Sequence, residues 1–317
     1  MDSFSYRVFT FSRQNGLIQP GERLIVSLSG GIDSMSLFCL LHSFSKQMAL
    51  DLHLVHFNHG LREESLEEED FLRDLANQKG VPITVFSSTS LKGTSGIQQK
   101  ARDWRNDCLI EVLKEQKFDK IALGHHLDDL VETQIWRMLR GASLFSLNPI
   151  QESSPPYIRP LLRFRKQDLE NYLLSINQEW CQDRSNFEND YTRNIIRNQL
   201  IPVMEEQAGG RLVDKMLALN DDAYQLKLDF ENQVPAATIE SEELGYQSIL
   251  SLSPVFAKEL IHRFLLHHGQ TEITRTQIED IHKLVKLNQG NWQIGLKQDK
   301  IITGRDKTVF ISQRSDV

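Results

Sequence analysis

The sequence predicts an α/β fold, with a doubly wound, mainly parallel sheet followed by a smaller α+β C-terminal domain. Residues 23–41 run from a short apolar strand through a glycine loop into a helix, and strand-type and helix-type patterns alternate four times along the chain. The glycine pair Gly209-Gly210 then separates this part from one of different pattern. With 317 residues, 40% of them hydrophobic, the chain is long enough for two cores. We therefore expect a first domain over residues 1–210 and a second, smaller domain over residues 211–317.

The first predicted unit combines a strand, a loop and a helix. Leu24 to Leu28 form an apolar run, Ser29-Gly30-Gly31 form a tight loop, and a helical period begins at Asp33. Adjacent glycines let backbone N–H groups converge on an anion, and the N-terminus of a helix favours phosphate. The loop is neither GxxxxGK[ST] nor GxGxxG. The alternative interpretation is a glycine turn whose Asp33 and Ser34 only cap a helix.

A second strand is predicted from alternating residues at 50–62, and it ends in a polar cluster. His56, Asn58, His59 and Arg62 stand at its carboxyl end. In an open parallel sheet, ligands bind at that edge, beside the strand that carries the glycine loop. A surface turn with incidental histidines is the alternative.

Three further elements follow: a charged helix from Ser65 to Lys79, a strand from Val81 to Phe86 and a helix from Ile97 to Glu115. Arg102 and Arg105 lie a turn apart on the last helix, so their guanidinium groups can point together. Spacing alone leaves two interpretations open. These arginines are solvated charges, or they stabilise charge that develops on a phosphoryl group.

Residues 120–143 predict a buried strand that runs directly into HHxDD and then into a helix ended by Gly141. Asp129 and Glu132 stand at positions i and i+3, so both carboxylates share one helical face near the end of the strand. Two carboxylates there could hold magnesium or receive an amine. The alternative is a carboxylate that merely complements the helix dipole.

The last polar cluster of the first domain is Arg193, Asn194 and Arg197, which lie close on one helical face. Pro202 is expected to end this helical pattern. Such a patch can bind a nucleotide through hydrogen bonds and stacking. An inter-helix polar interface is equally compatible with the pattern.

The C-terminal part predicts helices over residues 211–232, after Ser253 and over residues 275–287, followed by a β-hairpin or a three-stranded tip over residues 291–312. From Ala257 onward, 10 basic residues stand against 7 acidic ones. Because no catalytic constellation is visible there, we expect this domain to bind or position a partner.

Composition narrows the function classes. The net charge of −7 argues against a general nucleic-acid coating protein, although residues 131–166 carry a local charge of +4. No segment approaches the roughly 20 apolar residues of a membrane span, and the N-terminus lacks a secretory pattern, so we expect a cytoplasmic protein without membrane partners. Cys39, Cys108 and Cys181 are widely spaced, which suggests buried thiols instead of a disulfide framework or a zinc ribbon.

SGGIDS at 29–34 resembles the signature of the PP-loop ATP pyrophosphatases, which have an adenine nucleotide α-hydrolase-like fold. The full set of motifs resembles the tRNA(Ile)-lysidine synthetase family over nearly all of residues 22–205. These motifs are SGGIDS, HFNHGLR, AR(x2)R at 101–105, GHHLDDLVET, RPLL at 159–162, and DRSNFENDYTRNIIRNQLIP. The C-terminal pattern is similar to that family's first C-terminal domain, and longer members add another.

This resemblance implies that ATP adenylates the C2 oxygen of the wobble cytidine in a CAU-anticodon tRNA(Ile), and that free lysine then displaces AMP. Ser29, Gly30, Gly31, Ile32, Asp33 and Ser34 would bind the ATP phosphates, with His56 and Asn58 also at the nucleotide. Arg102 and Arg105 would stabilise the phosphate or the activated base, and Asp129 and Glu132 would position metal or the lysine ammonium. Arg193, Asn194 and Arg197 would shape the cytidine and tRNA site.

Mg²⁺ is the implied metal, with Asp33 and Asp129 as its ligands. The implied partners are the tRNA and free lysine, and a homodimer is compatible with a sequence that does not determine the oligomeric state. A tRNA thiolase of the same superfamily is the nearest alternative, although catalytic or cluster-binding cysteines would have to be paired. A non-catalytic RNA-binding protein is the alternative from another class, and it predicts a broken loop and missing carboxylates.

Overall fold

The computed structural model describes residues 2–58, 64–87, 97–181, 191–297 and 299–313. The chain divides into two compact units, Met1–Asn220 and Asp221–Val317. Within the described ranges, no helix has both the length and the apolar character of a membrane span. His59 and Arg62 of the predicted polar cluster lie outside the described residues.

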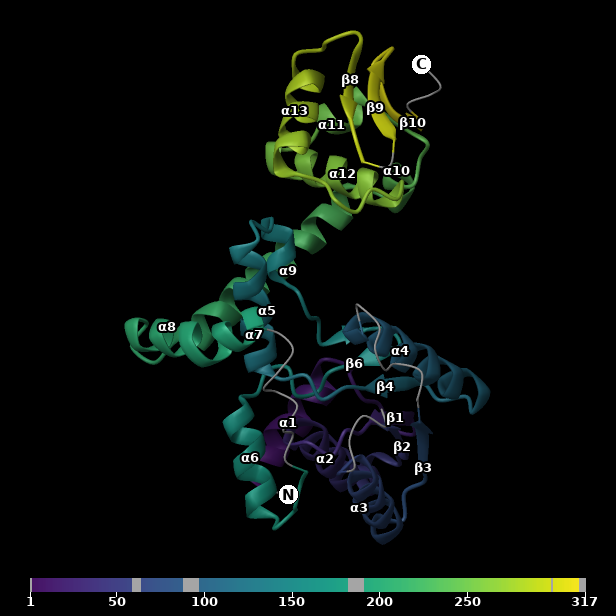
Figure 1. The fold of residues 1–317 in the computed structure, drawn as a ribbon, viewed down its shortest axis with the longest axis vertical. Coiled ribbons are helices and arrows are strands. Elements are labelled where there is room, and N and C mark those ends of the chain that lie inside the picture. The colour runs from purple at the N-terminus through teal and green to yellow at the C-terminus, as the bar shows by residue number, and fades with distance from the viewer. Residues whose placement is uncertain (1, 59–63, 88–96, 182–190, 298, 314–317) are drawn as a thin grey trace. The chain divides into compact units, whose positions relative to one another are not determined.

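The first unit contains a six-stranded sheet with the strand order β3-β2-β1-β4-β6-β5 (Figure 1). All neighbouring strands run parallel except the last pair, β5 and β6. The predicted doubly wound, mainly parallel sheet is thereby confirmed. The strands are β1 (Arg23–Ser27), β2 (Asp51–Asn58), β3 (Ile83–Ser87), β4 (Lys120–Ala122), β5 (Ser153–Ser154) and β6 (Tyr157–Ile158).

Helices cover both faces of this sheet because the strands alternate their apolar residues. Leu24 and Val26 of β1 point into a core shared with α1 (Ser3–Gln14), α2 (Ile32–Met48), α3 (Glu64–Lys79) and α6 (Lys166–Ser175). Ile25 points to the opposite face, where it packs with Leu109 and Val112 of α4 (Ile97–Glu115). Each face of the sheet therefore has its own apolar core.

A helical subdomain stands at the carboxyl end of the sheet. Its core joins α5 to the consecutive helical segments after residue 190 and to the start of α9. Its elements are α5 (Leu127–Leu139), η1 (Leu144–Leu147), α7 (Tyr191–Ile195), η3 (Ile196–Leu200), α8 (Ile201–Gln207) and α9 (Leu212–Gln233).

Pro202 does not end the helix, contrary to the expectation from sequence. The chain continues through a π-helical turn over Ile196–Leu200, in which the N–H of Ile201 donates to the carbonyl of Ile196, and α8 follows directly. Because proline has no N–H to donate to the preceding turn, a widened turn at this place lets the helix continue. Arg197 lies within that turn.

The second unit is an α+β module with a four-stranded antiparallel sheet of order β7-β10-β9-β8. The expected hairpin or three-stranded tip therefore has a fourth strand, β7. This strand is a short segment about fifty residues before β8, and its sequence is too short to show an alternating pattern. The elements are α10 (Ala236–Ile239), β7 (Glu243–Gly245), α11 (Tyr246–Leu250), α12 (Pro254–His267), α13 (Arg275–Lys286), β8 (Trp292–Gly295), β9 (Lys300–Arg305) and β10 (Thr308–Gln313).

Candidate functional site

The candidate site lies where the loops after β1 and β4 meet. These strands are neighbours in the sheet. From β1 the chain first passes to β2 and β3 on one side of β1, and it then continues with β4 on the other side. Such a reversal opens a crevice at the carboxyl ends of the strands. The approach is close at Gly124, after β4, where a Cβ atom would lie 3.1 Å from the backbone of Asp33. A larger residue at position 124 would push the two loops apart.

The loop Ser29–Ser34 has a fixed shape. The N–H of Ser29 donates to Oγ of Ser34 at 3.0 Å, the two hydroxyls lie 3.0 Å apart, and Ser34 Oγ also bonds to the Gly31 carbonyl at 3.2 Å. Gly31 caps α2 without any side-chain hydrogen bond. Among the described residues, no hydrogen bond is found for the first N–H groups of α2, beginning with Ile32 and Asp33, so they can receive an external anion.

Gly30 adopts φ +86°, a backbone conformation that favours glycine. Cys181 closes over it from another part of the chain: its N–H donates to the Gly30 carbonyl at 2.9 Å. A Cβ at position 30 would come within 3.0 Å of the Cys181 sulfur. Cys181 therefore packs directly against Gly30 of the loop.

His126 lies between three carboxylates. Its Nε2 is 3.4 Å from Asp33 Oδ1 and 3.5 Å from Asp129 Oδ2, and its Nδ1 is 3.6 Å from Asp128 Oδ2. Burial alone would lower the pKa of His126, but these acidic neighbours outweigh burial and raise it to about 9. The site therefore contains a buried imidazolium at neutral pH.

Asp128 links the site to α6. Its carboxylate accepts from the N–H of Lys166 at 2.7 Å and from Nε of Arg165 at 3.2 Å. Burial would raise the pKa of Asp128, yet these donors together with His126 hold it at about 2. Lys166 Nζ also lies 3.8 Å from Asp33 Oδ2. Burial would also raise the pKa of Asp33, but the nearby charges of His126 and Lys166 outweigh burial, and the pKa of Asp33 is lowered.

Glu132 and Asp129 share an arginine, as their spacing on α5 suggests. Arg197 Nε donates to Glu132 Oε2 at 2.9 Å, and its Nη2 forms ion pairs with Glu132 Oε2 at 2.7 Å and with Asp129 Oδ1 at 3.7 Å. Arg193 Nε approaches Glu132 Oε1 at 3.8 Å. Burial raises the pKa of Glu132, which is only 6% exposed. Asn194 is half-buried on the same helical segment.

Arg102 and Arg105 belong to a cationic group that also includes Arg159. The charge of Arg102 acts on Arg105, on Arg159 and on His125. Burial first, and then Arg159 and Arg102, lower the pKa of His125 to about 4. His125 is therefore neutral beside the arginines, whereas His126, the next residue, is charged.

His56 and Asn58 lie at the carboxyl end of β2, as the sequence predicts, but their side chains already have protein partners. His56 Nδ1 bonds with the Leu28 carbonyl at 2.9 Å, and Asn58 Nδ2 donates to Glu69 Oε2 at 2.9 Å. Both side chains are buried. They therefore hold the end of β2 against β1 and α3.

The donor set fits a phosphate with a divalent cation. Within the part of the chain that the structure describes, four buried polar atoms at this site have no hydrogen-bond partner: Asp33 Oδ1, His125 Nδ1, His126 Nδ1 and Arg159 Nε. No ready cage of three or more His, Cys, Asp or Glu side chains exists among those residues. Mg²⁺ suits such a place, because it is usually held by one or two carboxylates together with phosphate oxygens and water.

Sequence reasoning missed His126, Asp128, Arg159 and Lys166. The signal for the first two was present, because both belong to HHxDD, but the prediction concerned only Asp129 and Glu132. Arg159 is the first residue of the RPLL motif, but no role was assigned to it. Lys166 reaches the site from α6, and only the tertiary fold could assign it.

Comparison with known proteins identifies the family and its relatives. The family model of the PP-loop domain matches residues 3–204. The tRNA(Ile)-lysidine synthase of Pseudothermotoga lettingae is 28% identical over 309 residues, which cover 94% of this chain and 68% of that protein. The enzyme of the same name from Petrotoga mobilis is 28% identical over 297 residues, which cover 92% of this chain and 93% of that protein. That of Thermotoga maritima is 34% identical over 194 residues, 60% of this chain and 47% of the relative.

A solved structure shares the fold. The U34-tRNA thiolase NcsA from Methanococcus maripaludis, described with its [4Fe-4S] cluster, superposes with a TM-score of 0.58 at 17% identity, over 70% of this chain and 78% of that one. Here Cys39, Cys108 and Cys181 are free, and the first two are buried. The thiolase interpretation, which needs paired cysteines, is therefore not favoured.

Proposed function

The chain belongs to the PP-loop domain family, and we infer from that membership, from its relatives and from the site that it ligates lysine to a tRNA at the expense of ATP. The reaction joins lysine to C2 of the wobble cytidine in a CAU-anticodon isoleucine tRNA. One observation carries this inference: the phosphate-binding loop after β1 and the carboxylates of the loop after β4 meet around His126.

The reaction has two steps. In the first, the cytidine O2 attacks the α-phosphorus of ATP, the bond between the α-phosphorus and the bridging oxygen breaks, and pyrophosphate leaves. In the second, the lysine ε-nitrogen attacks C2, the C2–O bond breaks, AMP leaves with that oxygen, and the amine releases a proton. The first step needs a held pyrophosphate and a screened α-phosphate, and the second needs a positioned amine.

Ser29 to Ser34 are assigned to the departing pyrophosphate. Two features support this role: the free N–H groups at the start of α2 and the rigid pair of hydroxyls. Mg²⁺ would be held by Asp33 and Asp129 and would neutralise phosphate charge as a Lewis acid. His56 and Asn58, engaged with Leu28 and Glu69, would form the wall beside the nucleoside.

The remaining groups are assigned to the acceptor side. Arg102 and Arg105, joined by Arg159, supply fixed positive charge for the α-phosphate or the activated base. Asp129 and Glu132 would receive the lysine ammonium. Arg193, Asn194 and Arg197 would hold the cytidine, which is supported by the contacts of both arginines with Glu132.

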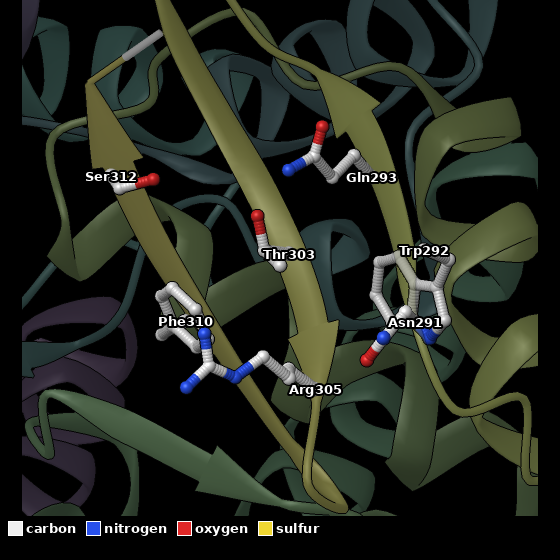
Figure 2. Close-up of a pocket in the computed structure, with 7 residues that line it drawn as sticks. All are labelled: Asn291, Trp292, Gln293, Thr303, Arg305, Phe310 and Ser312. Atoms are coloured by element: carbon white, nitrogen blue, oxygen red, sulfur yellow. The ribbon is translucent and has the colours of Figure 1, made fainter. Parts of the chain in front are cut away.

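We assign the second unit to tRNA positioning. Its sheet carries a hollow of about 590 Å³, lined by Asn291, Trp292, Gln293, Thr303, Arg305, Phe310 and Ser312 (Figure 2). Gln293, Thr303 and Phe310 are paired across three adjacent strands. Thr303 is 8% exposed, and among the described residues its hydroxyl has no hydrogen-bond partner. An aromatic ring, an arginine and amide groups on a sheet suit an RNA backbone or an unpaired base.

One assay tests the proposed function. Purified protein is incubated with a CAU-anticodon isoleucine tRNA transcript, ATP, Mg²⁺ and labelled lysine. We expect label in the tRNA together with AMP and pyrophosphate, and loss of at least about 100-fold in rate for Asp33→Asn, which removes one carboxylate charge. Asp51→Asn, an exposed aspartate paired with Arg23, is the matched control and should retain the rate. Release of γ-phosphate, or failure to incorporate lysine, would refute the proposal.

A further inference from the structure

The indole of Trp136, one turn beyond Glu132 on α5, has two guanidinium groups near it, those of Arg140 at the end of α5 and of Arg193 on α7. The Arg140 Cζ atom lies 4.2 Å from the centroid of the Trp136 ring, and the Arg193 Cζ atom lies 6.0 Å from it. Trp136 is half-buried and Arg140 is exposed. Arg140 and the indole therefore form a flat, positively charged platform with one side on the solvent.

The platform is continuous with the proposed active site. Glu132, Trp136 and Arg140 follow one another at four-residue intervals, so they share one face of α5. Arg193 reaches both Glu132, at 3.8 Å, and Trp136. From Glu132 to Arg140 the helix extends about 12 Å. A chain that enters the site at Glu132 therefore passes the platform within a few residues or nucleotides.

Charge and apolar surface occur together around the platform. Arg137 donates to the Ser146 carbonyl at 2.8 Å, which holds η1 against the end of α5. Beside that anchor, Met138, Leu139 and Leu144 are 48%, 64% and 54% exposed. With the exposed guanidinium of Arg140 on the indole, the surface suits a partner that is both flat and negatively charged. Single-stranded RNA has both properties, because its bases have π-faces and its backbone has phosphates.

We propose that the platform formed by Trp136 and Arg140, with Arg193 beside it, stacks a base that immediately flanks the wobble cytidine and neutralises its phosphate. This inference rests on the proposed function, because that function places the cytidine at Arg193, beside Glu132. Unpaired bases stack on aromatic rings and on guanidinium planes alike. The rival explanation is an internal contact that merely holds α7 on α5, and the experiments separate the two.

The protein side is tested with full-length variants. Trp136→Leu removes the π-face, and we expect KM for tRNA to rise about tenfold while KM for ATP stays constant, since a stacked base contributes on that scale. Trp136→Phe keeps an aromatic face and should recover most of the affinity. Arg140→Ala should lower the salt dependence of tRNA binding by about one charge. Arg13→Ala is the control, because it removes an equal charge and a cation–π contact, with Phe9, on α1.

The RNA side supplies the decisive measurement. Two transcripts are made, each with an abasic nucleotide in place of the base immediately 5′ or 3′ of the wobble cytidine. We expect the wild-type protein to bind one of these abasic transcripts about tenfold more weakly than intact tRNA. For Trp136→Leu, the affinities for that abasic transcript and for intact tRNA should differ by no more than about twofold. Equal losses in both proteins, or no loss in the wild type, would overturn the proposal.

Two controls make these results unambiguous. Thermal unfolding of each variant shows whether it is still folded at the temperature of the binding measurement. A variant that binds weakly because its packing is damaged is recognised in this way. Lysine incorporation by the wild type into intact tRNA is measured in the same preparation. If incorporation fails, the proposed function is wrong; if incorporation is normal and no coupling is found, only the platform is wrong.

Discussion

At the residue scale, two adjacent histidines at the end of β4 have opposite protonation. The pKa of His125 is lowered to about 4, first by burial and further by Arg159 and Arg102, whereas three carboxylates raise the pKa of His126 to about 9 despite burial. The two adjacent imidazoles thus differ in charge, because burial and the arginines dominate at His125 and the carboxylates dominate at His126.

Glu132 provides a residue-scale test of the acceptor side. Glu132→Gln should lower turnover about 100-fold, because the variant cannot hold an ammonium or fix the charges of Arg197 and Arg193. Its free energy of unfolding should fall by only about 1–3 kcal/mol, since the amide retains a hydrogen bond. Steady-state kinetics and urea unfolding measure the two effects.

A matched buried pair in the second unit is the control for that test. Glu259 has a 7% exposed side chain and accepts from Arg263 Nε at 2.8 Å. Glu259→Gln should therefore destabilise the protein by a similar amount and leave kcat unchanged. If Glu132→Gln also retains kcat, Glu132 has only a structural role.

Local spacing predicted some of these contacts and could not predict others. Asp129 and Glu132 lie three residues apart, and the structure places both carboxylates at Arg197, as one helical face requires. Asp128 bonds to Arg165 and to the backbone of Lys166, nearly forty residues later. No periodicity encodes such a contact, because it depends on where α6 packs against the loop after β4.

At the element scale, the glycine loop, which we propose binds phosphate, has a shape that depends on a distant segment. Its strand, loop and helix follow from local pattern, although β1 ends at Ser27 and α2 begins at Ile32, one residue earlier in each case than expected. The hydrogen bond from Cys181 to Gly30 could not be predicted, since no motif connects these positions. The local sequence therefore predicts where the loop lies, whereas its conformation also depends on a contact with a distant part of the chain.

Gly30→Ala tests this dependence. The added Cβ would meet the Cys181 sulfur at 3.0 Å in a left-handed conformation, so we expect the loop to shift and KM for ATP to rise about tenfold. Gly21→Ala is the matched control: its φ is +81° and no atom of the described residues lies within 4 Å of the new atom. Both variants should lose about 1–2 kcal/mol of stability from backbone strain.

A second substitution distinguishes the clash from the strain. Cys181→Ala combined with Gly30→Ala removes the sulfur, and KM for ATP should then recover part of the way toward that of the Cys181→Ala protein. Equal ATP kinetics in Gly30→Ala and Gly21→Ala would show that Cys181 does not shape the loop.

At the scale of the whole molecule, strand order determines where chemistry takes place. The alternation of strands and helices predicted the α/β class, but it is compatible with several orders of the same strands. In the observed order, β1 and β4 are neighbours, so motifs nearly one hundred residues apart meet at one edge. Sequence placed each motif at the end of a strand, and the topology decided which strand ends are adjacent.

The division of the chain provides the last prediction. Sequence suggests a boundary after Gly210, whereas contacts divide the chain after Asn220. Leu212, Val213 and Met216 are buried in the core around α5, the Gln134 side chain donates to the Met216 carbonyl, and Asn148 donates to Asn220. A chain ending at 210 would lose all of these contacts, and burial of three such side chains contributes on the order of 5 kcal/mol.

We therefore expect residues 1–220 to unfold cooperatively with a midpoint clearly above that of residues 1–210, as measured by circular dichroism in urea. The longer fragment should also retain ATP binding, because every residue assigned to the nucleotide lies before position 220. Equal midpoints would mean that the start of α9 adds nothing to the first core. If only the longer fragment is stable, the first domain includes the first turns of α9. Effects of the second unit on tRNA selection can then be measured without disturbing the site.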